Sequence, residues 1–334
     1  MSVPAGVTAA GGGDNHASFN SEGNLLVSDQ FNNRAIEVNP ESRAIVWSFG
    51  SGNPALCNPG PGAIIGPNDA ERLGGGLTLL AGTGIPHCAD NRVIVVNHRG
   101  DIVWQYGQAG VAGSGTNQLS VPVFAIQLPS RNIMVVDQAN NRVIEIGRFS
   151  KSIVWSYGPT SAPGALNNPN SAELLPNGHI LIADENNNRV IEITRSGHIV
   201  WQYGSGDPSI STPVQFAAFA SRLPNGNTLI TDSGHSRIIE VTEDKQIVWQ
   251  YVTNAAPHSI AAPLPTNAVR VANGNTSIAD QFNNRVLIVN ENRDRVFQYG
   301  KTGVAGNTHG RLNGPYTSFV VGDYTGQTAP PEDF

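Results

Sequence analysis

One stretch of this sequence, DENNNRVIEITRSGHIVWQYG from Asp184 to Gly204, recurs six times with small changes. The other copies begin at Asp29, Gly82, Asp137 and Asp232, and the last at Asp280. Every copy has an arginine at one fixed position, followed at a similar interval by an aromatic residue. The arginines are Arg34, Arg92, Arg142, Arg189, Arg237 and Arg285, and the aromatic residues are Trp47, Trp104, Trp155, Trp201, Trp249 and Phe297. A unit of about 50 residues repeated in this way indicates an array of one supersecondary structure.

Each copy is typical of four short strands. In the fourth copy, Val, Ile and Trp fill the expected strands, while Gly, Asn and Pro fill the expected turns. Six such units closed into a ring predict an all-β fold, a six-bladed β-propeller with four antiparallel strands per blade. We expect a single domain over residues 1–334, with blades at about 14–50, 66–107, 121–158, 169–204, 216–252 and 264–300 and an extra closing strand at 314–321.

The segment GPYTSFVV, from Gly314 to Val321, resembles a seventh copy of the innermost strand. It either closes the ring beside the first blade or competes with His16–Asn20 for the innermost place in that blade. The sequence leaves both arrangements open. The tail GQTAPPEDF that follows is expected to be frayed.

Composition narrows the function classes. The chain has 334 residues, a net charge of −6 and only 14% charged residues, with no basic stripe, which argues against a nucleic-acid partner. No apolar run is long enough to span a membrane. No signal peptide is visible, but a mature secreted or periplasmic chain preceded by an added Met would look the same. The compartment therefore stays open, and we expect a monomer.

The two cysteines, Cys57 and Cys88, both lie in loops around the second repeat, the copy with an enlarged loop and no Asp at position 82. Spacing alone does not distinguish a disulfide that pins this loop from two reduced thiols. A disulfide would suit an oxidising compartment.

Aligning the copies places an alanine in the first strand of every blade, as crowding around an axis would require: Ala17, Ala70, Ala125, Ala172, Ala220 and Ala268. The residues before these alanines differ between copies and are His16, Asp69, Phe124, Ser171, Phe219 and Asn267. Variation at a fixed position of a repeat suggests function rather than folding. A partly apolar hub with a few polar groups is typical of a small-molecule site.

The hub also offers acid–base chemistry. His16 and Asp69 lie on neighbouring blades, so the carboxylate could orient the imidazole as a general base. Glu71 and Glu173 come two residues after the variable position, and burial would raise the pKa of both carboxyls. The alternative is that these groups only hydrogen-bond one another and water in a blocked channel.

The loops at the same end contain further histidines: His87, His235, His258 and His309. With His16 they could form a zinc site, for which His16, His258 and His309 are the candidates, although no ligand spacing supports it. The DENNN segment looks like a calcium loop, but its recurrence favours a structural Asp–Arg pair in each blade.

The pattern NGHILIADENNNRVIEI…GHIVWQYG resembles the NHL-repeat propellers and, through its ending, the arylsulfotransferase-like propellers. The resemblance implies a six-bladed fold. Sulfotransferases of that type place histidines at the start of inner strands, a position that only His16 matches here. Related NHL-like lyases hold zinc with several inner histidines, and NHL domains also serve as interaction scaffolds.

We therefore predict a stand-alone propeller that binds a small, partly aromatic molecule at the loop-rich end of its axis. Acid–base catalysis of lyase, hydrolase or cyclase type would use His16, Asp69, Glu71 and Glu173. The predicted ligand-binding residues are Phe124, Ser171, Phe219, Asn267, Tyr316, His87, His235, His258 and His309. No cofactor is expected. The alternatives are a non-catalytic protein-interaction scaffold, and a sulfotransferase-like enzyme or zinc lyase that uses His16.

Overall fold

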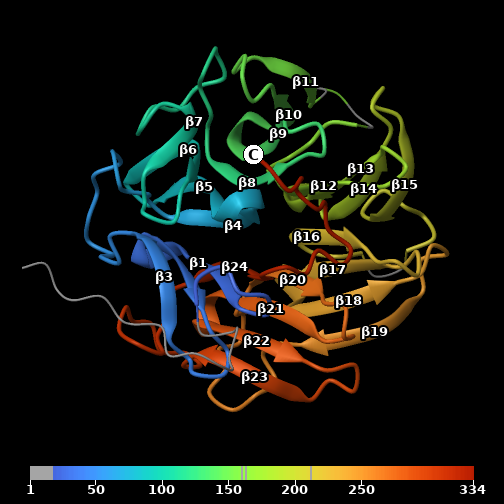
Figure 1. The fold of residues 1–334 in the computed structure, drawn as a ribbon. Coiled ribbons are helices and arrows are strands. Elements are labelled where there is room, and N and C mark those ends of the chain that lie inside the picture. The colour runs from blue at the N-terminus through green and yellow to red at the C-terminus, as the bar shows by residue number, and fades with distance from the viewer. Residues whose placement is uncertain (1–17, 159–160, 162–163, 211–212) are drawn as a thin grey trace, which may run out of the picture.

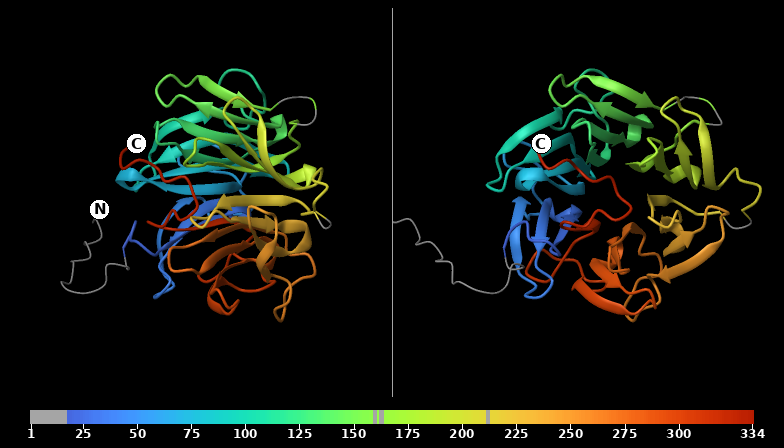
Figure 2. Two further views of the ribbon diagram at one scale, coloured as in Figure 1. Left: turned by 90° about the vertical axis from the view of Figure 1, so that its right-hand side faces the viewer. Right: turned by 45° about the vertical axis from the view of Figure 1, so that its right-hand side comes forward.

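The computed structural model describes residues 18–158, 161, 164–210 and 213–334. They form six four-stranded antiparallel sheets arranged as blades around one axis, so the predicted six-bladed β-propeller is confirmed (Figure 1). The innermost strands contact one another in a closed cycle, and the outermost strands form the rim (Figure 2). Among the described residues, no helix has the length and apolar character needed to cross a membrane.

Each blade contributes four strands, in order from the axis outward. Blade 1 contains β24 (Pro315–Val320), β1 (Leu25–Asp29), β2 (Arg34–Val38) and β3 (Ile45–Gly50); blade 2 contains β4 (Pro67–Leu73), β5 (Leu77–Ile85), β6 (Cys88–Val96) and β7 (Ile102–Gly107); blade 3 contains β8 (Pro122–Gln127), β9 (Ile133–Asp137), β10 (Arg142–Ile146) and β11 (Ile153–Tyr157). Blade 4 contains β12 (Pro169–Leu174), β13 (Ile180–Asp184), β14 (Arg189–Ile193) and β15 (Ile199–Gly204); blade 5 contains β16 (Ala217–Arg222), β17 (Thr228–Asp232), β18 (Arg237–Val241) and β19 (Ile247–Val252); blade 6 contains β20 (Pro265–Arg270), β21 (Thr276–Asp280), β22 (Arg285–Val289) and β23 (Arg295–Gly300).

The described helical segments are all short 3-10 turns. They are η1 (Gln30–Asn32), η2 (Gly74–Gly76), η3 (Gln138–Asn140), η4 (Glu185–Asn187), η5 (Ser233–His235) and η6 (Gln281–Asn283). Except for η2, each turn lies between the second and third strands of its blade, at the end of the axis where the inner strands begin. We call this the upper end, and the opposite end, where the inner strands finish, the lower end.

The last strand of the chain closes the ring. β24 pairs antiparallel with β1 and is the innermost strand of blade 1, so the segment at 314–321 takes the place that the alignment had assigned to His16–Asn20. Ser318 therefore occupies the position of the repeated alanine in this blade. His16 and Ala17 lie outside the described residues.

The DxxNNR motif, present in blades 1, 3, 4 and 6, joins its blade to the next. In blade 4, Arg189 Nε donates to Asp184 Oδ2 at 2.7 Å, and Asn187 donates to the same oxygen at 2.8 Å. Asn188 has a left-handed φ of 54°, and its side-chain oxygen accepts from the backbone N–H of Phe216, just before the next inner strand, at 2.8 Å. The Asp–Arg pair recurs in blades 1, 3, 5 and 6, so the predicted structural role of the motif is confirmed.

Blade 2 keeps an Asp–Arg pair, but its aspartate comes from another position of the motif. It has Gly82 where the other blades have Asp, and Asp90 of the neighbouring strand supplies the carboxylate for Arg92. A Cβ at Gly82 would lie 2.7 Å from Asp90 Cγ, so only glycine leaves room for the replacement. The carboxylate still accepts from a blade-to-blade loop, through the N–H of Ile65 at 2.7 Å.

The tryptophans of the outer strands make the second set of blade-to-blade contacts. Each indole N–H donates to a backbone carbonyl in the next blade at 2.8–3.1 Å, as Trp104 does to Arg148 and Trp201 to Glu243. Blade 6 has Phe297 instead, which has no N–H. There Arg43 of blade 1 lies 5.4 Å from the Phe297 ring centroid and donates to the carbonyl of Gln298.

The two cysteines form a disulfide, Cys57–Cys88, with a Cα–Cα distance of 5.6 Å. The bond ties the loop after blade 1 to the start of β6. Because it closes a loop of 31 residues, the chain-entropy model gives a stabilisation of roughly 3 to 4 kcal/mol.

We expect the Cys57→Ser/Cys88→Ser variant to lose that free energy of unfolding in urea denaturation. A variant as stable as the oxidised wild type would show that the loop is held by its other contacts.

Candidate functional site

The hub is built from equivalent positions of the six inner strands. The third residues of these strands are Thr317, Asp69, Phe124, Ser171, Phe219 and Asn267, and the fifth residues are Phe319, Glu71, Ile126, Glu173, Ser221 and Val269. Blade 1 thus contributes Thr317 and Phe319 to the hub rather than His16 and Ser18. The predicted pairing of His16 with Asp69 involves a residue outside the described ranges, and Thr317 occupies the hub position assigned to it.

The polar hub residues accept hydrogen bonds from backbone N–H groups on the axial side of the neighbouring inner strand, where no strand pairs with it. Asp69 Oδ2 accepts from the backbone N–H of Ala125 at 3.0 Å, and Glu71 Oε2 accepts from that of Gln127 at 2.9 Å. Ser171 and Asn267 do the same for the next blades, accepting from Ala220 and Ser318 at 3.3 and 3.2 Å. An inner strand has no neighbour on its axial side, so buried N–H groups there need side-chain acceptors. Four predicted site residues therefore have a structural role.

Aromatic side chains fill the middle of the axis. Phe124, Phe219 and Phe319, from alternate blades 3, 5 and 1, meet edge to face with centroid distances of 5.6 and 6.3 Å. Above them, the Tyr316 hydroxyl of blade 1 donates to Asn170 Oδ1 of the opposite blade 4 at 2.9 Å. The predicted ligand-binding residues Phe124, Phe219 and Tyr316 thus block the channel.

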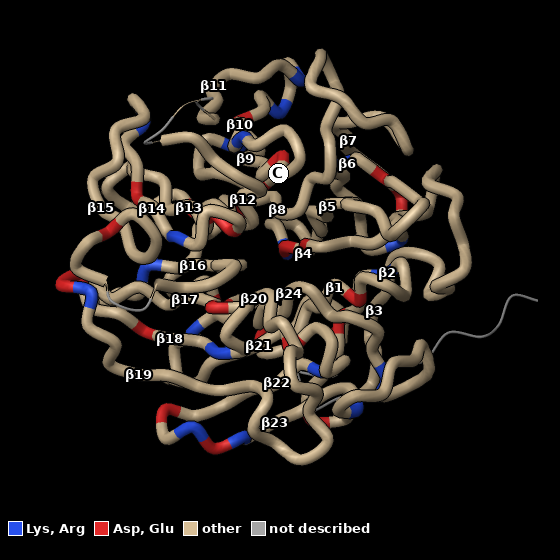
Figure 3. Tube along the Cα trace, turned by 180° about the vertical axis from the view of Figure 1, so that it is seen from behind, with Lys and Arg blue, Asp and Glu red and all other residues tan. Residues whose placement is uncertain are grey.

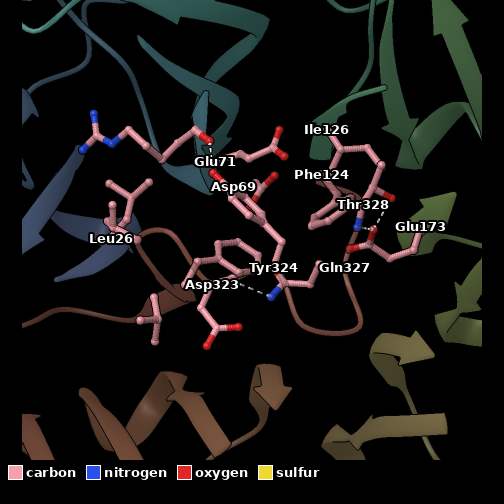
Figure 4. Close-up of a pocket in the computed structure, with 14 residues that line it drawn as sticks. Leu26, Asp69, Glu71, Phe124, Ile126, Glu173, Asp323, Tyr324, Gln327 and Thr328 are labelled. Atoms are coloured by element: carbon pink, nitrogen blue, oxygen red, sulfur yellow. Dashed lines mark hydrogen bonds between the residues drawn. The ribbon is translucent and has the colours of Figure 1, made fainter. Parts of the chain in front are cut away.

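A small cavity of about 20 Å³ lies below the aromatic plug. This volume is enough for about one water molecule. Its walls are the inner strands of blades 2, 3, 4 and 1, and the segment from Asp323 to Thr328 closes it (Figure 4). The Glu173 carboxylate accepts from both the backbone N–H and the hydroxyl of Thr328, at 2.8 and 2.6 Å. The tail expected to be frayed is instead ordered across the lower end of the axis.

Three buried carboxyls, those of Asp69, Glu71 and Glu173, share this cavity. Burial raises the pKa of Asp69 to about 7, while N–H donors from Ala125 and Ala70 oppose the shift and the charge of Glu173 adds to it. Burial also raises the pKa of Glu173 to about 7, against the hydrogen bonds from Thr328. The pKa of Glu71 is raised well above its ordinary value, again mainly by burial. Burial in this cavity is thus the physical cause of the higher pKa expected for Glu71 and Glu173.

The upper end carries a different group of side chains. Gln281 Nε2 donates to Gln30 Oε1 at 2.8 Å, and Gln30 Nε2 donates to Asn68 Oδ1 at 2.7 Å, so amides from blades 6, 1 and 2 form a chain around the mouth. Gln138 donates to Glu185 at 3.2 Å, and burial raises the pKa of Glu185 to about 7. Three amides at the mouth thus bond to one another, and a fourth bonds to the Glu185 carboxyl.

The predicted loop histidines do not converge on the hub. His235 bonds Asp232 of its own blade at 2.9 Å, and His258 lines a surface groove with Arg43 and Arg295. His87 and His309 are exposed, and His87 lies in the β5–β6 turn. Among the described residues, no group of three or more His, Cys, Asp or Glu is placed to hold a metal ion.

Sequence reasoning missed the residues that close the lower end: Tyr324, Gln327 and Thr328. One signal for them was present. The closing strand ends at the lower end of the hub, so the segment that follows begins beside that opening.

Fold and hub together define a six-bladed propeller with a plugged axis. Residues 89–304 match the PQQ_2 family, described as outer membrane protein assembly factor BamB, and the chain belongs to this family. No curated protein matches the chain. The resemblance to propellers is thereby confirmed, while the NHL-repeat and arylsulfotransferase-like types stay predictions.

Solved structures with a similar fold include three with low sequence identity. A protein of unknown function from Bacteroides caccae is 15% identical, with a TM-score of 0.58 over 83% of this chain and 93% of its own. A streptogramin B lyase is 14% identical, with a TM-score of 0.52 over 76% and 73%. A virginiamycin B lyase from Staphylococcus aureus is 15% identical, with a TM-score of 0.49 over 73% and 72%. At these identities the first two similarities show the fold alone.

Proposed function

We propose that this protein is a non-catalytic propeller that binds a protein partner through its loop-rich upper end. The observation that carries the proposal is the state of the hub. Asp69 and Glu71 bond to the backbone of the next inner strand, and Phe124 and Phe219 fill the axis. The family description, which names an assembly factor, supports the same role.

The upper end also offers apolar contact area. Six large apolar side chains in its loops and turns are each 38–41% exposed: Leu56, Val111, Phe216, Ile260, Phe282 and Val304. Phe282 stacks on Phe31 at a centroid distance of 6.2 Å, so two rings form one surface. Exposed apolar side chains with polar groups beside them occur in protein-binding surfaces. Charges of both signs are interspersed around the wheel, which favours no strongly charged partner (Figure 3).

The proposal predicts that two substitutions abolish partner binding. Phe216→Asp/Phe282→Asp places charges on the upper end without touching the hub, so partner recovery should fall at least tenfold. The measurement is quantitative affinity capture from the native source. Phe149→Asp is the matched control, since Phe149 is 82% exposed in the β10–β11 turn at the lower end. Identical partner sets for all three proteins would contradict the proposal.

A second candidate is ligand binding with acid–base chemistry, of lyase, hydrolase or cyclase type, in the lower cavity rather than at the upper end. The pKa of about 7 for Asp69 and Glu173 favours it, because such carboxyls exchange protons at neutral pH. The fold shared with streptogramin B lyase suggests a first substrate to assay. Incubation with a streptogramin B antibiotic, followed by chromatography, tests this. If neither the wild type nor a variant with a loosened tail converts it, lyase activity on that class is excluded.

A further inference from the structure

The C-terminal strap, Asp323–Phe334, crosses the lower end of the axis from blade 6 to blade 3 (Figures 1 and 2). It begins where Asp323 Oδ2 accepts from the backbone N–H of Ala272 at 2.8 Å. The Tyr324 hydroxyl then donates to the carbonyl of Arg72 at 2.7 Å. Farther along, Asp333 pairs with Arg131 at 2.7 Å on the exposed surface. The strap is thus held by separate anchors, only some of which touch the cavity.

The wall that the strap covers is acidic and apolar. Asp69, Glu71 and Glu173 line it together with apolar side chains of Leu26, Phe124, Ile126 and Phe319. The one basic residue in this lining is Arg72, whose guanidinium donates to Glu37 and Thr78, both at 2.6 Å, and stacks on Phe19 at 4.4 Å. The two terminal nitrogens of Arg72 are therefore committed to Thr78 and Glu37, while its buried Nε has no partner. The described lining supplies no other cation.

One carboxylate oxygen in this wall has no partner. Asp69 lines the cavity and is only 1% exposed, and its Oδ1 has no hydrogen-bond partner. The Thr317 hydroxyl is near enough to lower the pKa of Asp69, but its hydrogen-bond partner is Ser28, at 2.9 Å. A buried acceptor without a donor costs free energy that a ligand donor would recover.

The strap itself supplies donors of the kind that is missing. Thr328 offers Glu173 an N–H and an O–H side by side, as an ammonium group offers two of its three hydrogens. Its hydroxyl oxygen also accepts from the N–H of Leu174 at 2.9 Å. Figure 4 shows Tyr324 and Thr328 on the side of the cavity that the strap covers, opposite the acidic wall.

We propose that the lower cavity is a binding site for a ligand with an ammonium group on an apolar body, and that Asp323–Thr328 occupy it in the absence of that ligand. The carboxyls would pair with the ammonium group, and the aromatic plug would contact the apolar body. The ligand must displace the strap to enter, so strap and ligand compete. The inference deepens the second function proposed above and does not depend on the upper end.

The test compares binding of 2-phenylethylamine and its uncharged analogue 2-phenylethanol, by calorimetry at pH 7.5, to the full-length chain. Tyr324→Phe/Thr328→Val removes the strap's hydroxyl bonds at the cavity and keeps its length. We expect the amine to bind this variant at least tenfold more tightly than the wild type, and the alcohol to bind neither. Adding Glu173→Gln should abolish the gain. Arg131→Ala, which releases only the distal ion pair, is the control and should bind like the wild type.

Three outcomes would overturn the proposal: a folded double variant that binds no amine, equal binding of amine and alcohol, or an equal gain from Arg131→Ala. If the double variant does not fold, Thr328→Val alone decides by the same criteria. Hydrogen exchange in the wild type gives a second readout, because saturating amine should speed exchange of the Leu174 amide at least threefold. Binding without turnover would leave the site standing and reject only the catalytic function.

Discussion

Arg285→Met should lower the free energy of unfolding by about 3 to 5 kcal/mol, the loss expected when one partner of a buried ion pair is removed. Arg285 is 1% exposed and pairs with Asp280 at 2.7 Å, while its other nitrogens donate to Thr253, Ser259 and Thr302. Methionine has similar length, so the main effect is an uncompensated carboxylate rather than a cavity. Urea denaturation monitored by tryptophan fluorescence measures the loss.

Two further variants separate charge from packing. Asp280→Asn in the Arg285→Met background removes the unpaired charge and should recover part of the loss. Arg142→Met makes the same change in blade 3, where the arginine side chain is 18% exposed, and should cost less. Equal losses for Arg285→Met and Arg142→Met would show that burial of the pair does not set its contribution.

The stability of the protein should fall as the pH rises from about 4 to 7. Asp69 and Glu173 have ordinary pKa values of 3.8 and 4.5 and folded pKa values of about 7. A carboxyl with a raised folded pKa binds its proton more tightly when folded, so its contribution is complete below pH 4 and is lost as pH rises through 7. Each group accounts for roughly 3 to 4 kcal/mol over that range. Thermal unfolding followed across the pH range measures the slope.

Neutral isosteres test the origin of this slope. Asp69→Asn/Glu173→Gln should reduce the pH dependence between pH 4 and 7, because amides do not titrate. Glu71 and Glu185, whose pKa values are also raised by burial, keep part of the slope. Asp207→Asn is the control: the hydrogen bond from Lys245 lowers the pKa of Asp207 to about 2, so its titration is complete before this range begins. A slope unchanged in the double variant would assign the pH dependence to other carboxyls.

The repeat made the fold predictable because its uniform residues are those that join the blades. Asp184, Arg189 and Trp201 mark a strand end, a strand start and a blade-to-blade contact, and each recurs at a fixed spacing. The replacement for the missing Asp in blade 2 is also visible in the sequence, since Asp90 lies two residues before Arg92. The disulfide could only be named as an alternative, because spacing does not report the distance between two sulfurs.

The hub was less predictable because variation there has a second cause. Asp69, Ser171 and Asn267 differ chemically, yet each accepts a hydrogen bond from the next inner strand. Any short acceptor serves that purpose, so variation at these positions did not require a ligand. The strap contacts are long-range, as in Thr328 with Glu173, and no local pattern announces them.

Ring closure by β24 has a consequence for how the protein is made. A ribosome releases β1, β2 and β3 early, but the strand that completes their sheet comes nearly 300 residues later, as the pairing of Leu25 with Val320 shows. Until then the nascent first sheet keeps a bare edge on β1, a strand that is fully buried in the folded protein. Contacts of such sequence separation slow folding and prolong exposure to misassembly. The closed ring can therefore form only after residues 315–320 have been synthesised.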